Sequence, residues 1–125
     1  MKNRSLVARL GFALAGWKAA WKRERSFRTQ TWCALLAFIA LFMLQPPPIW
    51  WAFVALACAV VLALELVNSA LEALIDLLHP EVHPEIKIIK DMLAGAVLAV
   101  SCAALFGAII LGTSYVWAQL LSLES

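Results

Sequence analysis

The first apolar pattern along the chain has the period of an α-helix. Between residues 5 and 23, large apolar side chains recur in steps of three or four, at Leu6, Leu10, Leu14, Trp17 and Trp21. Most basic residues of this segment fall off that stripe. Such a helix, with tryptophan among its apolar residues, is typical of segments that lie along a membrane surface. We therefore predict a surface helix over residues 5–28, with an amphipathic helix packed on protein as the alternative.

Three longer apolar stretches follow, at residues 29–45, 49–78 and 91–117. A bilayer core of about 30 Å needs about 20 helical residues, so the first stretch is short for a span. It becomes longer if the residues around Arg28 also lie in the membrane, with the charged end of that side chain extended to the interface. Pro46, Pro47 and Pro48 separate the first two stretches, because consecutive prolines cannot continue a helix. A loop at 79–90 separates the second and third. The pattern predicts a single all-α membrane domain, with an interfacial helix and three transmembrane helices.

Composition supports this class. The chain of 125 residues is 64% hydrophobic and 14% charged, whereas soluble domains average about 45–50% apolar and about 25% charged residues. Lipid must therefore solvate part of the surface. The net charge of +2 says little by itself, but clustered basic residues in an otherwise apolar chain suit anionic lipid head groups better than nucleic acid. We therefore expect no nucleic-acid partner.

The basic residues predict the orientation in the membrane. Eight of the ten lysines and arginines lie in the first 28 residues, and the other two are Lys87 and Lys90. Because cytoplasmic segments are enriched in these residues, we expect the N-terminus and the 79–90 loop to be cytoplasmic. The C-terminus then lies outside, and the chain is a multi-pass protein of the inner or plasma membrane.

Acidic and polar residues share one face at the end of the second span. At 100° per residue, Glu72 and Asp76 fall within about 20° of Glu65 around the helix, and Asn68 and Ser69 flank the same stripe. Carboxylates beside a bilayer are retained where a cation, a metal or a water-filled cavity compensates them. Paired carboxylates suit Mg²⁺, and a single desolvated one suits a general base. The alternative is that Glu72 and Asp76 lie in solvent beyond the membrane.

Two further places carry candidate chemistry. Glu24 is the only acid among the first 64 residues, and it is either a metal ligand facing Glu72 or a partner of its basic neighbours. Lys90 can bind phosphate as a point charge, whereas Asp91 can simply favour the dipole of the helix that it begins. His79 and His83 alternate with prolines, which favours a solvated loop over a metal site. The P-loop and the other common nucleotide motifs are absent.

These residues resemble a known family. The run Glu65-x-x-Asn68-Ser69-Ala-x-Glu72-x-x-x-Asp76, followed fourteen residues later by Lys90-Asp91-Met92, is similar to the pattern of the small prokaryotic diacylglycerol kinases and undecaprenol kinases. The Glu24-x-x-Phe27-Arg28 block also fits. The resemblance implies a homotrimer with active sites shared between protomers. It implies transfer of the γ-phosphate of Mg·ATP to the hydroxyl of diacylglycerol or undecaprenol, at the cytoplasmic interface of the bilayer.

The resemblance also implies roles for individual residues. Glu65 matches the general base, and Glu24 and Glu72 match ligands of Mg²⁺. Nucleotide-binding positions are matched by Asn68, Glu72, Glu81, His83, Lys90 and Asp91. Contacts with the lipid substrate are expected from Trp21, Phe27, Arg28, Glu65 and Ser69. Asp76 matches an acid of less defined role.

Departures from the family pattern concern the choice of lipid. Gln30 stands where diacylglycerol kinases commonly have an acid, and Arg23 stands where they often have asparagine. The stretch from Asp91 to Leu98 looks closer to the undecaprenol kinase branch. Two other functions stay open: a proton or ion translocator, whose acids should cross the bilayer, and a non-catalytic membrane subunit, which does not need the carboxylate stripe together with Lys90 and Asp91.

Overall fold

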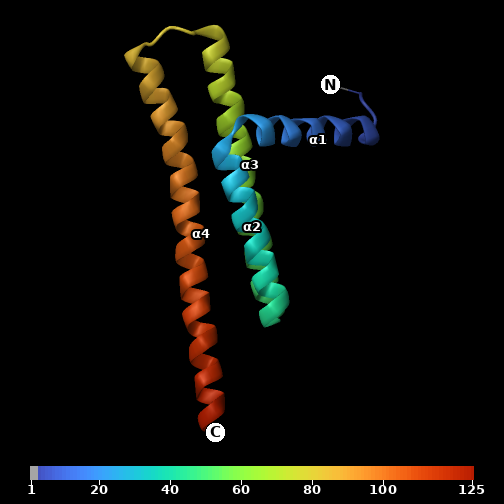
Figure 1. The fold of residues 1–125 in the computed structure, drawn as a ribbon, viewed down its shortest axis with the longest axis vertical. Helices are drawn as coiled ribbons and strands as arrows, with labels where there is room; N and C mark the ends of the chain where they lie inside the picture. Colours follow the sequence, from blue (N-terminus) through green and yellow to red (C-terminus); the bar gives the residue numbers. More distant parts are fainter. Residues whose placement is uncertain (1–2) are drawn as a thin grey trace.

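The computed structural model describes residues 3–125 as four helices: α1 (Leu6–Arg23), α2 (Arg25–Leu44), α3 (Pro48–Leu78) and α4 (Pro84–Glu124). Helices α2, α3 and α4 run along a common direction, and α1 lies across it (Figure 1). Each of these three helices is long and apolar enough to cross a membrane. The predicted all-α membrane architecture is therefore confirmed, and the crosswise α1 has the orientation that a surface helix requires.

The first helix is shorter than predicted. It ends at Arg23 rather than at residue 28, and α2 begins at Arg25 rather than at residue 29. The break is the single residue Glu24, whose backbone is extended at φ −114° and ψ 114°. Two side chains that follow the break explain it. Phe27 is drawn into the core, and the guanidinium of Arg28 hydrogen-bonds to carbonyl groups in the last turn of α1.

The loop between the second and third spans is also shorter than predicted. Only His79–His83 lies outside helix, because α4 begins at Pro84. Proline is tolerated in the first helical turn, where its missing N–H has no intrahelical partner to lose. Pro84 therefore starts a helix here rather than interrupting one. The other end of α4 continues beyond the predicted residue 117 to Glu124.

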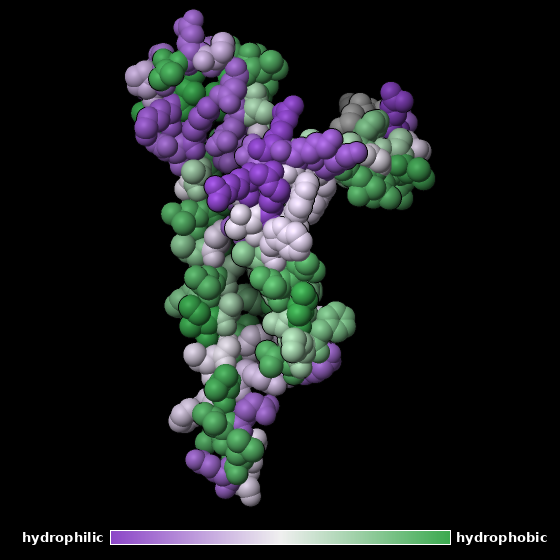
Figure 2. All heavy atoms as spheres, viewed as in Figure 1, coloured by the Kyte–Doolittle hydropathy of each residue, from purple (hydrophilic) through white to green (hydrophobic). Residues whose placement is uncertain are grey.

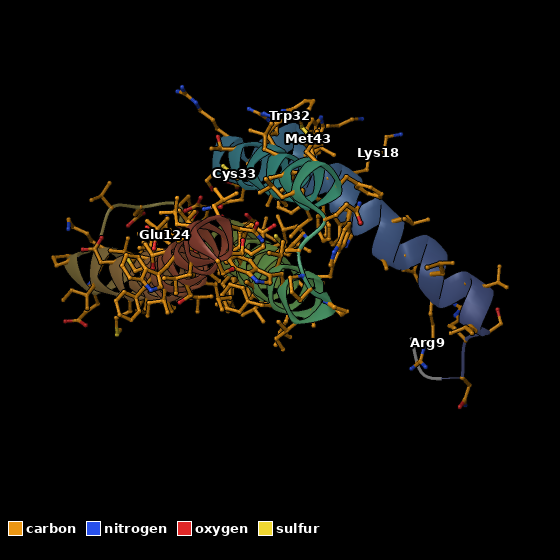
Figure 3. The ribbon with its side chains drawn as sticks, turned by 90° about the horizontal axis from the view of Figure 1, so that it is seen from below. Arg9, Lys18, Trp32, Cys33, Met43 and Glu124 are labelled. Atoms are coloured by element: carbon orange, nitrogen blue, oxygen red, sulfur yellow. The ribbon has the colours of Figure 1, made fainter. Side chains whose placement is uncertain are left out.

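The core lies where α1, α2 and α3 meet. Phe27 is 1% exposed and clusters with Ala20 and Leu62, and Leu66 packs against that cluster. Leu66 therefore faces protein rather than lipid. Elsewhere the helices present apolar side chains outward. Trp32 and Met43, for example, lie on the side of α2 that faces away from α3 and α4 (Figure 3).

Hydrophilic side chains are concentrated at one end of the molecule. Figure 2 shows them where α3 passes into α4 and around the junction of α1 and α2, while apolar side chains cover most of the rest of that face. The described part of α4 contains no buried residue. An all-round exposed apolar helix is stable only against lipid or another protein surface. The charged end thus lies at a membrane surface, next to the crosswise α1.

Packing between α3 and α4 depends on a glycine. A Cβ atom added at Gly107 would lie 2.6 Å from Cζ of Phe53. We expect Gly107→Ala to lower the apparent melting temperature in detergent, because overpacking costs about 1–3 kcal/mol and exceeds the gain of about 1 kcal/mol in helix propensity. The control is Gly112→Ala, also in α4, where an added Cβ meets nothing within 4 Å. Equal melting temperatures for the two variants would contradict this packing.

Candidate active site

Helix α3 is central to the site because it packs against each of the other three helices. It carries the predicted stripe of acidic and polar residues along its second half. The first acid of this stripe, Glu65, is only 3% exposed. Its Oε2 atom accepts a 2.8 Å hydrogen bond from the hydroxyl of Ser26 on α2. A buried carboxylate is costly unless it is hydrogen-bonded, and Ser26 supplies that bond.

The break between α1 and α2 positions both Glu24 and Ser26. The Glu24 N–H closes the last turn of α1 by donating to the Ala20 carbonyl over 2.8 Å. The Nη1 group of Arg28 donates to the Trp21 carbonyl over 2.7 Å. Unpaired carbonyls at a helix end need such partners. Arg28 therefore holds the sharp turn that brings Ser26 to α3.

A groove of about 470 Å³ runs between α1 and α3. Glu24 and Ser69 both line it, so the structure brings together a predicted metal ligand and a predicted lipid contact from opposite walls. Small residues make up much of the lining: Ala13, Gly16, Ala19, Ala20, Ala70 and Ala73. Their short side chains leave the space open. The groove is wide enough for a small polar group or a hydrocarbon chain.

Two polar side chains beside this region lack partners. Oδ1 of Asn68 and Oγ of Ser69 are buried and make no hydrogen bond in the described structure. A buried polar atom without a partner costs free energy, and native structures contain few of them. Both residues belong to the stripe that begins at Glu65. Oγ of Ser101 on α4 is a third such atom, so missing partners are not confined to the stripe.

The donor set fits a magnesium ion only in part. Glu24 and Glu72 are half-buried, and both offer the hard oxygen ligands that Mg²⁺ prefers. Among residues 3–125, no group of three or more His, Cys, Asp or Glu side chains is close enough to hold a metal ion. Mg²⁺ at phosphoryl-transfer sites is usually bound by one or two carboxylates, water and substrate phosphates. The residues present are therefore compatible with Mg²⁺ that arrives with a nucleotide.

A second group of predicted residues gathers where α3 passes into α4. A pocket of about 270 Å³ is lined by Asp76, Glu81, His83, Lys90 and Asp91, among others. Nζ of Lys90 contacts Oδ1 of Asp76 at 2.5 Å, and Lys87 pairs with Asp91 at 2.7 Å. The Lys90–Asp76 contact joins α4 to α3, whereas the Lys87–Asp91 pair lies within the first turns of α4. Four of the six predicted nucleotide-binding residues therefore share one pocket, while Asn68 and Glu72 lie further back along α3.

Lys90 is a residue of this pocket that can bind an anionic ligand. Lys90 precedes the uncharged stretch of α4 that begins at Met92. Its hydrogen bond to Asp76 raises the pKa of the Lys90 ammonium group, and a lysine is already fully charged at neutral pH. The side chain is about one-third exposed. A phosphate entering the pocket can therefore reach it.

His83 has a structural task in addition to its predicted one. It is the N-cap residue of α4, and its Nδ1 atom accepts a 3.1 Å hydrogen bond from the N–H of Glu85. Capping satisfies one of the free N–H groups at a helix start. The Nε2 atom of the ring remains available to a ligand. The side chain of His83 is exposed, so a ligand can reach this nitrogen.

The Asp76–Lys90 pair leads to a prediction about nucleotide binding. We expect Asp76→Asn to raise the KM for ATP, because Lys90 loses the partner that orders it. The rise should be only about fivefold, since an exposed ion pair contributes modestly. The value of kcat should stay within twofold. Steady-state kinetics at saturating lipid measure both constants. The control is Glu85→Gln, which removes the same charge from the exposed first turn of α4; an equal rise in KM in that variant would contradict a specific role for the pair.

The residues predicted to contact the lipid differ in how accessible their side chains are. Phe27 is buried and stacks edge-on against Trp17, with ring centroids 5.3 Å apart. Its observed role is therefore to anchor α2 to the core. Trp21 is 39% exposed, beside Trp32 at 6.2 Å between centroids, which leaves part of its ring free for a lipid. Ser69 lines the groove next to α1, and Arg28 is engaged with the end of α1.

Sequence reasoning missed Ser26. The hydroxyl meets Glu65 across 39 positions of sequence, and a serine in the first turn of a helix is too common to attract notice. One signal was present: Ser26 lies two residues after Glu24, in the same block that matched the family pattern. Only the helix crossing shows that this block faces Glu65.

Comparison with known proteins identifies the family of this chain. Residues 11–111 match the family described as prokaryotic diacylglycerol kinase. A diacylglycerol kinase from Synechocystis is 36% identical over 120 residues, which cover 95% of this chain and 66% of that protein. A diacylglycerol kinase from Helicobacter pylori strain J99 is 32% identical over 93 residues, covering 74% of this chain and 73% of the relative. The enzyme of the same name from Escherichia coli K12 is 31% identical over 93 residues, which cover 76% of its length.

The match runs through α1, α2 and α3 and into α4, so it includes Glu24, Glu65 and Lys90. It therefore covers both groups of candidate site residues, and the helices that position them. This chain belongs to the prokaryotic diacylglycerol kinase family and is a lipid kinase of the membrane.

Proposed function

We propose that this lipid kinase transfers the γ-phosphate of ATP, bound with Mg²⁺, to the hydroxyl group of a membrane lipid. The observation that carries the proposal is the buried carboxylate of Glu65, which lies at the junction of α1, α2 and α3. This junction is at the level where the crosswise α1 meets the apolar spans (Figure 1). A lipid alcohol is anchored at that same level, with its chains in the hydrocarbon.

The chemistry required is modest. Phosphoryl transfer depends mainly on positioning and on neutralising charge. In our proposal the hydroxyl oxygen of the lipid forms a bond to the γ-phosphorus, and Glu65 accepts the proton of that hydroxyl. The bond from that phosphorus to the β–γ bridging oxygen breaks, and ADP leaves. Mg²⁺ held by Glu24 and Glu72 would offset the phosphate charge. Lys90 would add a positive charge on the nucleotide side.

Nucleotide binding is proposed at the charged end of α3 and α4. Asn68 and Glu72 lie on the same face of α3 as Glu65, and at 1.5 Å per residue Asp76 is about 16 Å further along the axis. A nucleotide reaching from the Lys90 pocket toward Glu65 would thus pass the unpartnered Oδ1 atom of Asn68. Asn68, Glu81, His83 and Asp91 are the proposed contacts along this path.

Diacylglycerol is the acceptor that we propose first, because the three relatives above bear the name diacylglycerol kinase. Undecaprenol is the second candidate. Two observations favour it: neutral Gln30 and basic Arg23 occupy positions where the resemblance predicts an acid and an asparagine. Arg23 lines the α1–α3 groove, which is also lined by Ser69, a predicted lipid contact. Phosphatidate or undecaprenyl phosphate would be the product.

The test supplies both lipids in parallel. Purified protein in detergent receives radiolabelled Mg·ATP with diacylglycerol or with undecaprenol, and the phosphorylated lipid is measured. We expect transfer to one alcohol, and its identity names the substrate. Absence of transfer to either lipid, in protein shown to be folded and membrane-extracted, would overturn the proposal in favour of a non-catalytic subunit. The burial of a single acid among the described residues gives no support to a proton relay across the bilayer.

A homotrimer and a defined orientation complete the proposal. The apolar surface of α4 is unburied, and the pocket near Lys90 is separated from Glu65 along α3. A trimer would cover the apolar surface of α4. Active sites shared between protomers would also bring a Lys90 pocket close to a Glu65 carboxylate. The N-terminus and the α3–α4 loop would be cytoplasmic, with the C-terminus outside. Cross-linking in native membranes tests the trimer, and a cysteine-labelling map of the loop tests the orientation.

A further inference from the structure

We propose that Ser26 is a positioning residue for the proton acceptor of this kinase. Its hydroxyl would hold the Glu65 carboxylate in one orientation, so that one oxygen points toward the lipid alcohol. The inference rests on the proposed role of Glu65 as general base. The contact that motivates it joins Oγ of Ser26 to Oε2 of Glu65 at 2.8 Å and bridges α2 and α3.

The hydrogen bond gives the two carboxylate oxygens different tasks. The terminal torsion of a glutamate side chain is broad, so a carboxylate without a fixed donor can present either oxygen. Ser26 occupies Oε2. The other oxygen, Oε1, is then free to accept the proton of the substrate.

The position of Ser26 is itself fixed by its surroundings. It lies in the first turn of α2, two residues after the break at Glu24, and directly before Phe27, which is 1% exposed. Arg28 then ties the same turn to carbonyl groups of α1. The backbone around Ser26 is therefore held from both sides. The geometry of the α1–α2 junction therefore determines where the Ser26 hydroxyl lies, and so the orientation in which it holds the Glu65 carboxylate.

Two other roles would give the same contact. Ser26 could merely satisfy a buried charge, which would affect folding but not the rate per folded enzyme. Alternatively, its hydroxyl could occupy the place of the lipid alcohol, and would then compete with the substrate. These roles predict different kinetic constants, so kinetics separate them from positioning.

The experiment compares Ser26→Ala and Ser26→Thr with the parent enzyme, in mixed micelles with the lipid that it phosphorylates. For Ser26→Ala we expect kcat to fall about tenfold, the effect of losing a hydrogen bond to a charged group. The KM values for ATP and lipid should stay within twofold. Ser26→Thr keeps the hydroxyl and should recover most of kcat. The matched control is Thr29→Ala, which removes a hydroxyl one turn later that bonds only to the Arg25 carbonyl.

Coupling to Glu65 provides a second readout. If Ser26 acts through Glu65, adding Ser26→Ala to Glu65→Gln should lower the residual rate by less than twofold, because the two changes share one effect. An unchanged kcat in Ser26→Ala overturns the proposal, as does a lower KM for lipid with a raised kcat. So does a loss of melting temperature with an unaffected rate per folded enzyme. A fully active Glu65→Gln enzyme would instead refute the proposed base itself, which separates the two failures.

Discussion

Glu65→Gln is expected to lower the rate of lipid phosphorylation about a thousandfold, which lies within the range of 10²–10⁴ for loss of a general base. The amide has nearly the same shape as the carboxylate and can still accept a hydrogen bond from Ser26, but it cannot take up the proton of the alcohol. The fold should persist. Removing a buried charge is often neutral or stabilising when the space remains filled, so the melting temperature should not fall.

The measurement is radiolabel transfer from ATP to lipid, together with the melting temperature in the same detergent. The control is Glu124→Gln, the same chemical change at the exposed far end of α4 (Figure 3), which should keep full activity. A Glu65→Gln enzyme within tenfold of the parent would contradict a proton acceptor at this position. An inactive enzyme that has also lost its melting transition would show a folding defect, and Glu65→Asp would then be used to test the chemistry in a folded background.

Glu24→Gln and Glu72→Gln are each expected to lower the rate about a hundredfold and to raise the Mg²⁺ concentration that gives half-maximal rate. The physical reason is that a carboxylate ligand contributes both affinity for the ion and charge balance in phosphoryl transfer. Glu24 lines the α1–α3 groove at the α1–α2 junction, and Glu72 is half-buried on α3, two helical turns after Glu65. Losing either one should leave the ion bound by phosphate and a single carboxylate.

Initial rates over a range of Mg²⁺ at fixed ATP give the required concentration. Glu85→Gln is the comparison, because that carboxylate lies in the exposed first turn of α4, so its removal should leave the Mg²⁺ dependence unaltered. Parent-like Mg²⁺ curves for both glutamine variants would contradict the proposed ligands. A shift in Glu72→Gln alone would assign Glu24 to its basic neighbours instead, which is the alternative that the sequence left open.

The helices were largely predictable from local pattern. Long apolar runs, basic flanks and the triple proline at 46–48 are signals within single segments, and the four helices follow them. The junction of α1 and α2 and both ends of α4 were predicted wrongly by several residues. The break at Glu24 depends on burial of Phe27 against Ala20 and Leu62, and these contacts involve residues far apart in the chain. The start of α4 at Pro84 depends on the choice between two prolines, both of which are able to begin a helix.

The candidate site was predictable to the extent that it lies on one helix. Glu65, Asn68 and Glu72 share a face because the helical repeat fixes their angles. The repeat gives no information on what that face meets. It therefore could not indicate that Glu65 would be buried at 3% exposure while Asp76 would lie in an exposed ion pair.

The sequence by itself determined the class of the protein, its helices and the face of α3 that carries the acids, because hydropathy and helical period are properties of neighbouring residues. The tertiary structure decided which acid is buried and which hydroxyl meets it. Ser26 and Glu65 are 39 positions apart, and they meet because α1 turns sharply into α2 and α2 packs on α3. Burial depends on how helices cross, and that crossing is set by many long-range contacts acting together.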